Sequence, residues 1–169
     1  YTVGAIVINN AVGNPLLNDG PYFLSGHLEL DKEFGGYGPS NKKYDNILRA
    51  KRIPPSLGIT DTLNDISSNT VIGVVATDAP LTRANLKRIA IMAHDGIAKS
   101  LSPAHTPMDG DTIFSISTNQ SDKKQILENV DILALGSRAS DCVARACNRA
   151  VYEAISIGSS KPGWKSLFS

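Results

Sequence analysis

The chain has 169 residues, 41% of them hydrophobic, which is enough to bury the core of one domain of ordinary size. Its 17 basic and 16 acidic residues leave a net charge of +1, so no electrostatic argument favours nucleic acid or an anionic membrane as a partner. Its apolar runs are far shorter than a membrane span, and the sequence therefore predicts a globular domain that binds neither.

The two cysteines and the first residues indicate the setting of the chain. Cys142 and Cys147 lie five residues apart in a predicted helix, so their side chains point to different faces and cannot easily form a disulfide. A reducing, cytoplasmic setting is therefore expected. The chain opens on a strand pattern without an initiator Met or a signal peptide, and we expect it to be the later part of a longer gene product.

The first part of the chain predicts one strand and then a long irregular segment. Residues 2–10 are rich in Val and Ile and predict a buried strand, which "AVGNPL" ends. From about Asn18 to Asn69 only turn and loop signals such as "FGGYGPSNKK" occur, apart from a short amphipathic piece near residues 44–50. Such a stretch in a compact domain indicates a linker, a mobile lid or a processed region.

Regular structure returns at Thr70. Residues 70–77 predict a strand covered on both faces, and Thr82 is expected to cap a helix that runs to about Ser100. Residues 111–118 and 131–137 predict two more strands. The last helix is expected to end at Gly158 and to bury an apolar stripe, formed by Val143, Cys147, Ala150, Val151, Ala154 and Ile155. This order of elements indicates helices packed on a sheet in a layered α+β or α/β fold.

Thr70 stands where the irregular segment meets the strand. A β-branched residue suits a strand start, which is one interpretation of this threonine. The other is self-cleavage of the Asn69–Thr70 peptide, which would give Thr70 a free α-amino group with an ordinary pKa of about 7.7 to 8.0, able to deprotonate the threonine's own hydroxyl. Asn69 fits this interpretation because asparagine tolerates unusual backbone angles that can strain a peptide bond.

Two acids and an asparagine are the candidate partners of Thr70. Asp109 and Asp111 flank Gly110 at the mouth of a predicted strand, where period-2 geometry puts both carboxylates on one face. They could orient the Thr70 amine and relay protons, or they could simply be acids of a solvated loop. The side-chain amide of Asn10 could donate to an oxyanion, or Asn10 could end its strand by turn chemistry.

Metal and nucleic-acid sites are not expected. A calcium loop starting at Asp109 fails because Phe114 stands at the glycine position and Gln120 at the bidentate glutamate position. The three histidines have no metal-site spacing, and no cofactor is expected. The basic run "NKKYDNILRAKR" is interpreted as a solvated linker.

Residues 69–118 resemble the opening of the small subunit of self-processing N-terminal-nucleophile aminopeptidases and amidohydrolases. The resemblance rests on Asn-Thr before a strand, followed by "VATDA", "AHDG" and "DGD" at matching distances. It extends over nearly the whole chain through "VGAIVINNAVG", "SRASDCVARACNRAV" and the "GW" near the end. This family includes β-aminopeptidases, the L-aminopeptidase/D-esterase group, nylon-oligomer hydrolases and an acyl-cysteine-cleaving enzyme of carbapenem biosynthesis.

The resemblance implies a fold, an activity and a role for each candidate residue. It makes Thr70 the nucleophile, Asn10 the oxyanion donor, and Asp109 and Asp111 the acidic pair that supports Thr70. The implied fold is an α+β four-layer αββα sandwich, shared with ornithine acetyltransferase, of which this chain is the C-terminal part. Cleavage between Asn69 and Thr70 would leave residues 1–69 as the end of a large chain with a variable tail, and residues 70–169 as the small chain.

The same resemblance implies partners and leaves alternatives. The expected substrates are small peptides or amides, the missing N-terminal part of the large chain is an expected partner, and a homo-oligomer is expected. An acyltransferase of the ornithine acetyltransferase type is the first alternative, although that group has alanine rather than Asn69 before the nucleophile and "TML" rather than "TVI" after the cut. A non-catalytic binding domain, in which Thr70 is only a strand residue, is the second.

Overall fold

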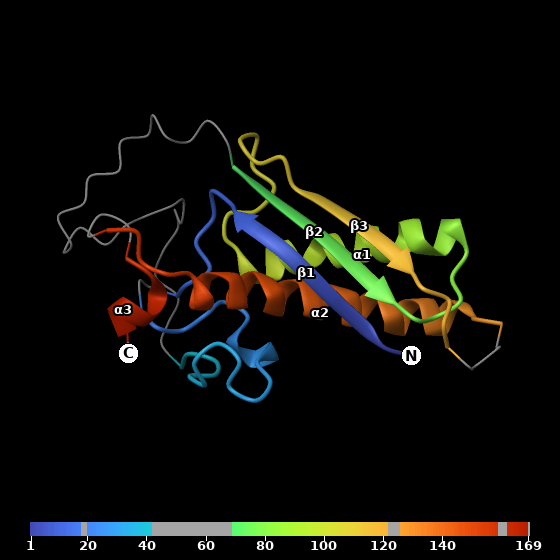
Figure 1. Ribbon diagram of the computed structural model, residues 1–169, viewed down its shortest axis with the longest axis horizontal. Helices are drawn as coiled ribbons and strands as arrows, with labels where there is room; N and C mark the ends of the chain where they lie inside the picture. Colours follow the sequence, from blue (N-terminus) through green and yellow to red (C-terminus); the bar gives the residue numbers. More distant parts are fainter. Residues whose placement is uncertain (18–19, 42–68, 122–125, 159–161, 169) are drawn as a thin grey trace.

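The computed structural model describes residues 1–17, 20–41, 69–121, 126–158 and 162–168. The amphipathic piece predicted near residues 44–50 lies outside these ranges. In chain order the described elements are β1 (Val3–Asn10), the short 3-10 helix η1 (Gly26–Leu28), β2 (Thr70–Thr77), α1 (Arg83–Ser100), β3 (Thr112–Ser117), α2 (Asn129–Glu153) and α3 (Trp164–Phe168). Figure 1 shows α1 and α2 side by side behind one face of the sheet, so the described chain forms two layers.

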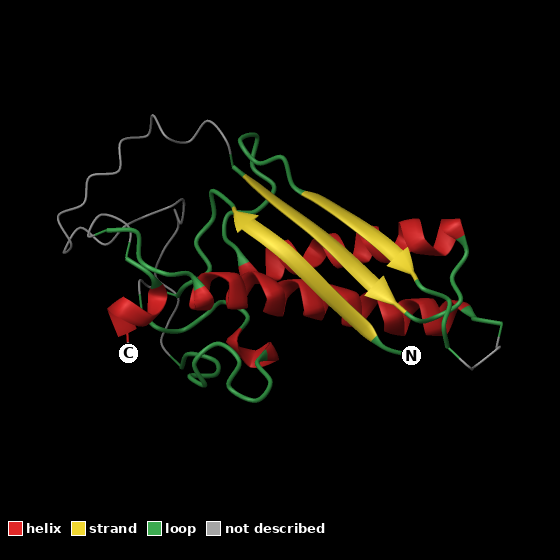
Figure 2. Ribbon diagram, in the orientation of Figure 1, coloured by secondary structure: helices red, strands yellow, loops and turns green. Residues whose placement is uncertain are grey.

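The three strands form one sheet in the order β1-β2-β3. β1 runs antiparallel to β2, and β3 runs parallel to β2 (Figure 2). Parallel neighbours need a crossover connection, which α1 supplies. The strands predicted over residues 2–10, 70–77 and 111–118 are therefore confirmed, together with a mixed α+β architecture.

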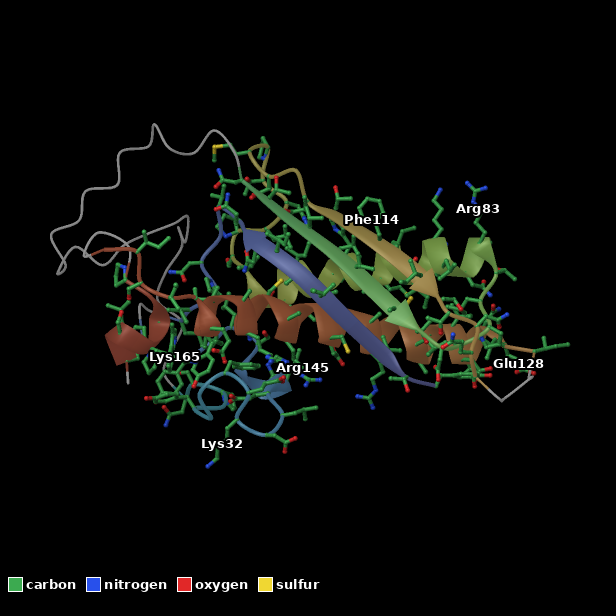
Figure 3. The ribbon with its side chains drawn as sticks, in the orientation of Figure 1. Lys32, Arg83, Phe114, Glu128, Arg145 and Lys165 are labelled. Carbon is green, nitrogen blue, oxygen red and sulfur yellow. The ribbon has the colours of Figure 1, made fainter. Side chains whose placement is uncertain are left out.

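The two faces of the sheet differ in their environment. On the face toward the helices, Val71 and Val75 are fully buried. On the opposite face most side chains are also apolar but lie open: Ile8 is 72% exposed, and Phe114, labelled in Figure 3, is 57% exposed. The prediction that both faces of residues 70–77 are covered is thus met by the described chain only on the helix side.

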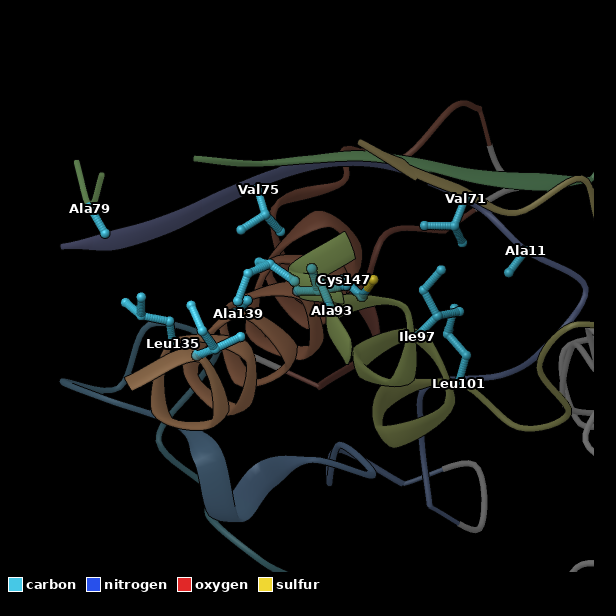
Figure 4. Close-up of a cluster of buried hydrophobic side chains, with 13 residues drawn as sticks. Ala11, Val71, Val75, Ala79, Ala93, Ile97, Leu101, Leu135, Ala139 and Cys147 are labelled. Atoms are coloured by element: carbon cyan, nitrogen blue, oxygen red, sulfur yellow. The ribbon is translucent and has the colours of Figure 1, made fainter. Parts of the chain in front are cut away.

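The core lies between the sheet and the two long helices. Figure 4 shows Val71 and Val75 pointing from the strands toward Ile97 and Ala139 of the helices. The helices approach each other closely because Gly96 lacks a side chain: a Cβ there would lie 2.3 Å from the backbone oxygen of Ser140. The helix predicted from a Thr82 cap to Ser100 is confirmed, since the Thr82 hydroxyl accepts a hydrogen bond from the backbone N–H of Asn85.

The strand predicted over residues 131–137 is wrong, because these residues form the first turns of α2. A short apolar run does not distinguish a strand from a buried helix, and here Ile132 and Leu135 continue a helical stripe. The N-terminus is fixed by a capping box in which Glu128 and Asp131 each accept from the other's backbone N–H. The helix also ends at Glu153 rather than at Gly158. Among the described residues, no helix has the length and apolar character needed to cross a membrane.

A second, aromatic cluster joins residues 20–41 to the end of the chain. Phe23, Phe34 and Trp164 are buried together, with the Phe23 and Trp164 rings stacked 5.8 Å apart. The Asn148 side-chain amide donates to the Ser25 hydroxyl at 2.6 Å. The described part of the segment that the sequence predicted to be irregular is therefore packed, although η1 is its only regular element among the described residues.

An ion pair strengthens this attachment. The Arg145 guanidinium of α2 donates to both carboxylate oxygens of Glu33, one of these bonds being 3.0 Å long. Partial burial alone would raise the pKa of Glu33, but hydrogen bonds from Arg145 and from the Leu30 N–H, together with the charges of Arg145 and Arg149, hold that pKa below its usual value. Glu33 is therefore stabilised as a carboxylate against the helix layer.

Candidate active site

Thr70 is the first residue of β2, and its side chain lies beside the peptide bond that precedes it. The Thr70 hydroxyl donates a hydrogen bond to the carbonyl oxygen of Asn69, a residue that is only 3% exposed. The backbone N–H of Gly110 donates to the same oxygen at 3.1 Å. Two donors therefore converge on the carbonyl group of the Asn69–Thr70 peptide, a geometry that stabilises negative charge on that oxygen.

Gly110 comes this close because it has no side chain. A Cβ at residue 110 would lie 3.0 Å from the Thr70 hydroxyl oxygen, closer than ordinary van der Waals contact. The isolated parallel bridge between Asn69 and Asp109 aligns the two chain segments just ahead of the β2–β3 ladder. The glycine between the two acids thus permits a close backbone approach to Thr70.

Asn10, the last residue of β1, is the direct partner of Thr70 in the antiparallel ladder. Side chains of directly opposed residues stand on the same face of a sheet, so Asn10 and Thr70 share the face turned away from the helices. Asn9, the preceding residue, points to the other face, and its side-chain amide donates to the backbone oxygen of Cys147 at 3.4 Å. The structure therefore brings the predicted oxyanion donor beside the predicted nucleophile.

The Asp109 carboxylate binds neighbouring backbone. One oxygen accepts the N–H of Val12 at 3.0 Å, and the other accepts the N–H and the hydroxyl of Thr106 at 3.2 and 2.5 Å. Asp109 therefore ties the chain that leaves β1 to the loop before β3. It is fully engaged in hydrogen bonds, unlike an acid of a solvated loop.

The Asp111 carboxylate is buried next to the strand that carries Thr70. Its side chain is 4% exposed, and one oxygen accepts the N–H of Val71 at 2.9 Å. The other oxygen lies 2.7 Å from Nδ1 of His105. In the described residues no hydrogen bond joins Asp109 or Asp111 to the Thr70 hydroxyl; Asp111 holds the N–H of the next residue, Val71, whereas Asp109 holds Val12 and Thr106.

Burial disfavours the thiolate form of both cysteines. Burial raises the pKa of Cys147 to about 11 and also raises the pKa of Cys142. A thiol needs a lowered pKa to react as a thiolate near neutral pH. The predicted site residues, Thr70, Asn10, Asn69, Asp109 and Asp111, instead gather at one end of the sheet, where β1 ends and β2 begins.

Two histidines, His94 and His105, lie beside these residues and are not among the candidates that the sequence pattern gives. Their spacing in the sequence matches no metal site, and among the described residues no group of three or more His, Cys, Asp or Glu could hold a metal ion. In the fold the two rings stack with centroids 4.3 Å apart, and both residues contact Asp111. The available signal was the position of His105 and Thr106 just ahead of the two acids in "AHTPMDGD".

The sequence was compared with those of known proteins. Residues 1–162 match the model of a protein family described as "Peptidase family S58". The chain is 37% identical over 153 residues to an uncharacterized aminopeptidase of Mycobacterium tuberculosis, an alignment that covers 86% of this chain and 42% of the relative. It is 35% identical over 164 residues to an uncharacterized aminopeptidase of Mycobacterium leprae, covering 92% of this chain and 42% of the relative.

A more distant relative has a more specific name. The chain is 29% identical over 98 residues to a 6-aminohexanoate-oligomer endohydrolase of Agromyces, with 54% of this chain and 25% of the relative covered. The chain thus spans less than half the length of the curated relatives that it matches. The resemblance drawn from the motifs around Thr70 is confirmed by the match over residues 1–162, and the chain belongs to peptidase family S58.

Proposed function

We propose that the whole protein is a self-cleaving N-terminal-nucleophile hydrolase that cuts amide bonds of small peptides or amides through an acyl-enzyme on Thr70. The observation that carries this proposal is the carbonyl group of Asn69, which accepts hydrogen bonds from both the Thr70 hydroxyl and the Gly110 N–H. The hydroxyl is thereby held next to the carbonyl group that it would attack, and the Gly110 N–H is already placed to stabilise the oxyanion that would form.

In maturation, the Asn69–Thr70 peptide bond of each chain would be cut once. The Thr70 oxygen attacks the carbonyl carbon of Asn69, while the Gly110 N–H stabilises the oxyanion. The C–N bond then breaks and the hydroxyl proton passes to the leaving nitrogen, so the acyl group moves to the Thr70 oxygen as an ester and the α-amino group becomes free. Water hydrolyses the ester, which leaves a carboxylate on Asn69 and a free hydroxyl on Thr70. Residues 1–69 and 70–169 would then belong to separate chains.

Turnover would repeat the chemistry on a substrate. The free amine of Thr70 takes the proton of its own hydroxyl, whose oxygen attacks the substrate amide; the proton then passes to the leaving amine, and the acyl group stays on Thr70 as an ester. Water, deprotonated by the same α-amino group, hydrolyses this ester, which releases the carboxylic acid product and restores the Thr70 hydroxyl. The Asn10 amide stands on the same face as Thr70 and is the donor proposed for the substrate oxyanion. Asp111 holds the N–H of Val71 directly after the nucleophile, whereas Asp109 holds the N–H of Val12 and so fixes the segment that pairs with Asn69.

The open apolar face supports the finer fold prediction. Thr70 and Asn10 lie at the end of the sheet face on which Ile8 and Phe114 are exposed. A second sheet with its own helices, supplied by the missing N-terminal part, would cover this face and complete a four-layer αββα sandwich. The reactive residues would then lie between the two sheets, and that missing part would supply the remaining walls of the substrate site.

The relatives suggest the substrate class. Two of them are named aminopeptidases and one is named for the hydrolysis of 6-aminohexanoate oligomers, which are joined by amide bonds. We propose substrates of the same kind, short amides with a free amine. Residues of the missing N-terminal part, which would form the remaining walls of the substrate site, would select the acyl group.

Denaturing mass analysis of the full-length gene product tests the proposal. The wild type is expected to give two fragments, the smaller one starting at Thr70, and both Thr70→Ala and Thr70→Val should leave one intact chain. Thr70→Ser keeps the hydroxyl and should still be cut. Cleavage after Asn69 in the Thr70→Ala protein would show that another group performs the cut, and an intact wild type would argue against self-cleavage altogether.

A further inference from the structure

The Asp111 carboxylate lies between the backbone of β2, next to Thr70, and the side chain of His105. One oxygen accepts the N–H of Val71, the residue directly after Thr70, and the other faces Nδ1 of His105 at 2.7 Å. A carboxylate with a side chain only 4% exposed keeps its charge at low cost only when hydrogen-bond donors satisfy it. Because an ionised carboxylate only accepts, Nδ1 of His105 carries the proton that it donates.

The His105 ring is held by its own backbone conformation and by His94 of α1. Its backbone adopts a φ of 54°, a left-handed conformation that few residues other than glycine take, so the loop presents this side chain in a defined direction. The ring stacks on His94 of α1, with 24° between the planes. Nε2 of His94 in turn contacts the backbone oxygen of Asp111 at 3.3 Å. The imidazole is therefore fixed against the helix while its side chain stays 36% exposed.

We propose that His105 is a positioning residue for Thr70, acting through Asp111. Its Nδ1–H fixes the rotation of the Asp111 carboxylate, the carboxylate fixes the N–H of Val71, and Val71 fixes the first residue of β2. This inference rests on the proposed function for its kinetic consequences but not for its geometry. A displacement of about 1 Å at a reacting group can cost about 100-fold in rate, so a relaxed carboxylate would slow both cleavage and turnover.

Two variants of His105 separate this role from others. The amide nitrogen of Asn reaches the place of Nδ1, whereas the amide nitrogen of Gln reaches the place of Nε2. In the full-length protein, His105→Asn is expected to slow self-cleavage by about threefold and His105→Gln by about 100-fold. His27→Gln, at an exposed histidine of η1, is the matched control and should cleave like the wild type.

Hydrogen exchange measures the positioning itself, without any need for activity. In the uncut Thr70→Ala background, the Val71 amide should exchange about tenfold faster with His105→Gln than with His105→Asn. If the wild type is not cut but this exchange pattern holds, the proposed function fails while the positioning role stands. If Val71 exchanges equally in both variants, or if the wild type is cut and both variants cleave at the same rate, the proposal is overturned. Should His105→Gln fail to fold, His105→Ala takes its place in the same comparison.

Discussion

The two faces of the sheet are built from similar residues but have different surroundings. Val71 and Val75 are fully buried under α1 and α2, whereas Ile72 and Phe114 on the other face are 46% and 57% exposed. A contiguous apolar surface of this kind marks a place where something else binds or packs. In the described chain the helix side of the sheet is therefore buried, whereas the face that carries Thr70 is uncovered.

The largest change in stability is expected when an apolar side chain on the open face of the sheet is truncated. In the full-length protein, Phe114→Ala should lower the free energy of unfolding by about 3 to 5 kcal/mol, because the proposed second sheet buries the ring. Urea denaturation of the uncut Thr70→Ala protein measures this change. A loss below about 0.5 kcal/mol would mean that the face remains in water and that the four-layer proposal is wrong.

Truncation of a side chain on the helix side of the sheet should lower the free energy of unfolding whether or not the proposed second sheet is present. Ile97 is fully buried between the helices and the sheet, so Ile97→Ala should cost about 2 to 5 kcal/mol. Ile91→Ala on the same helix, where the side chain is 50% exposed, is the matched control and should change stability far less. Equal losses for Ile91 and Ile97 would indicate that α1 is covered on its outer side as well.

Close helix packing predicts a smaller effect at Gly96. The Cβ of Gly96→Ala would meet the Ser140 backbone oxygen and push the helices apart, at a cost of about 1 to 3 kcal/mol. The contrasting variant is Gly4→Ala, because no atom of the described chain lies within 4 Å of a Cβ there. Thermal unfolding of both proteins would compare the packed and the open regions directly, and an unchanged midpoint for Gly96→Ala would contradict the packing.

The smallest effect concerns the Glu33–Arg145 pair, and it depends on pH. The folded-state pKa of Glu33 is lowered, so its contribution is present above the unfolded pKa of about 4.3 and is lost as the pH falls through the lower folded value. Glu33→Gln should cost about 1 kcal/mol at pH 7 and nothing at pH 2. Denaturation curves at the two pH values check this, and a difference that persists in acid would exclude the carboxylate as its cause.

The sequence predicted the strands that carry the site because Val- and Ile-rich runs are bounded by turn signals at Asn10 and Asn69. It failed at residues 131–137, where the apolar run is too short to define a period and the capping box decides the helix. The histidine pair could not be predicted from local pattern, because stacking of His94 on His105 depends on how α1 packs against the loop before β3. The roles proposed for Asn10, Asp109 and Asp111 came from motif resemblance, which local propensity does not supply.

The aromatic cluster around Trp164 has a consequence for the mature molecule. Phe23 and Phe34 lie before the proposed cut, and Trp164 lies after it. The Ser25–Asn148 and Glu33–Arg145 contacts also join a residue before the cut to a residue after it. After cleavage these contacts, and the hydrogen bonds that pair β1 with β2, would join two separate chains. Unfolding would then release two molecules, so each tenfold dilution would weaken the apparent stability by about 1.4 kcal/mol, a concentration dependence that the uncut chain lacks.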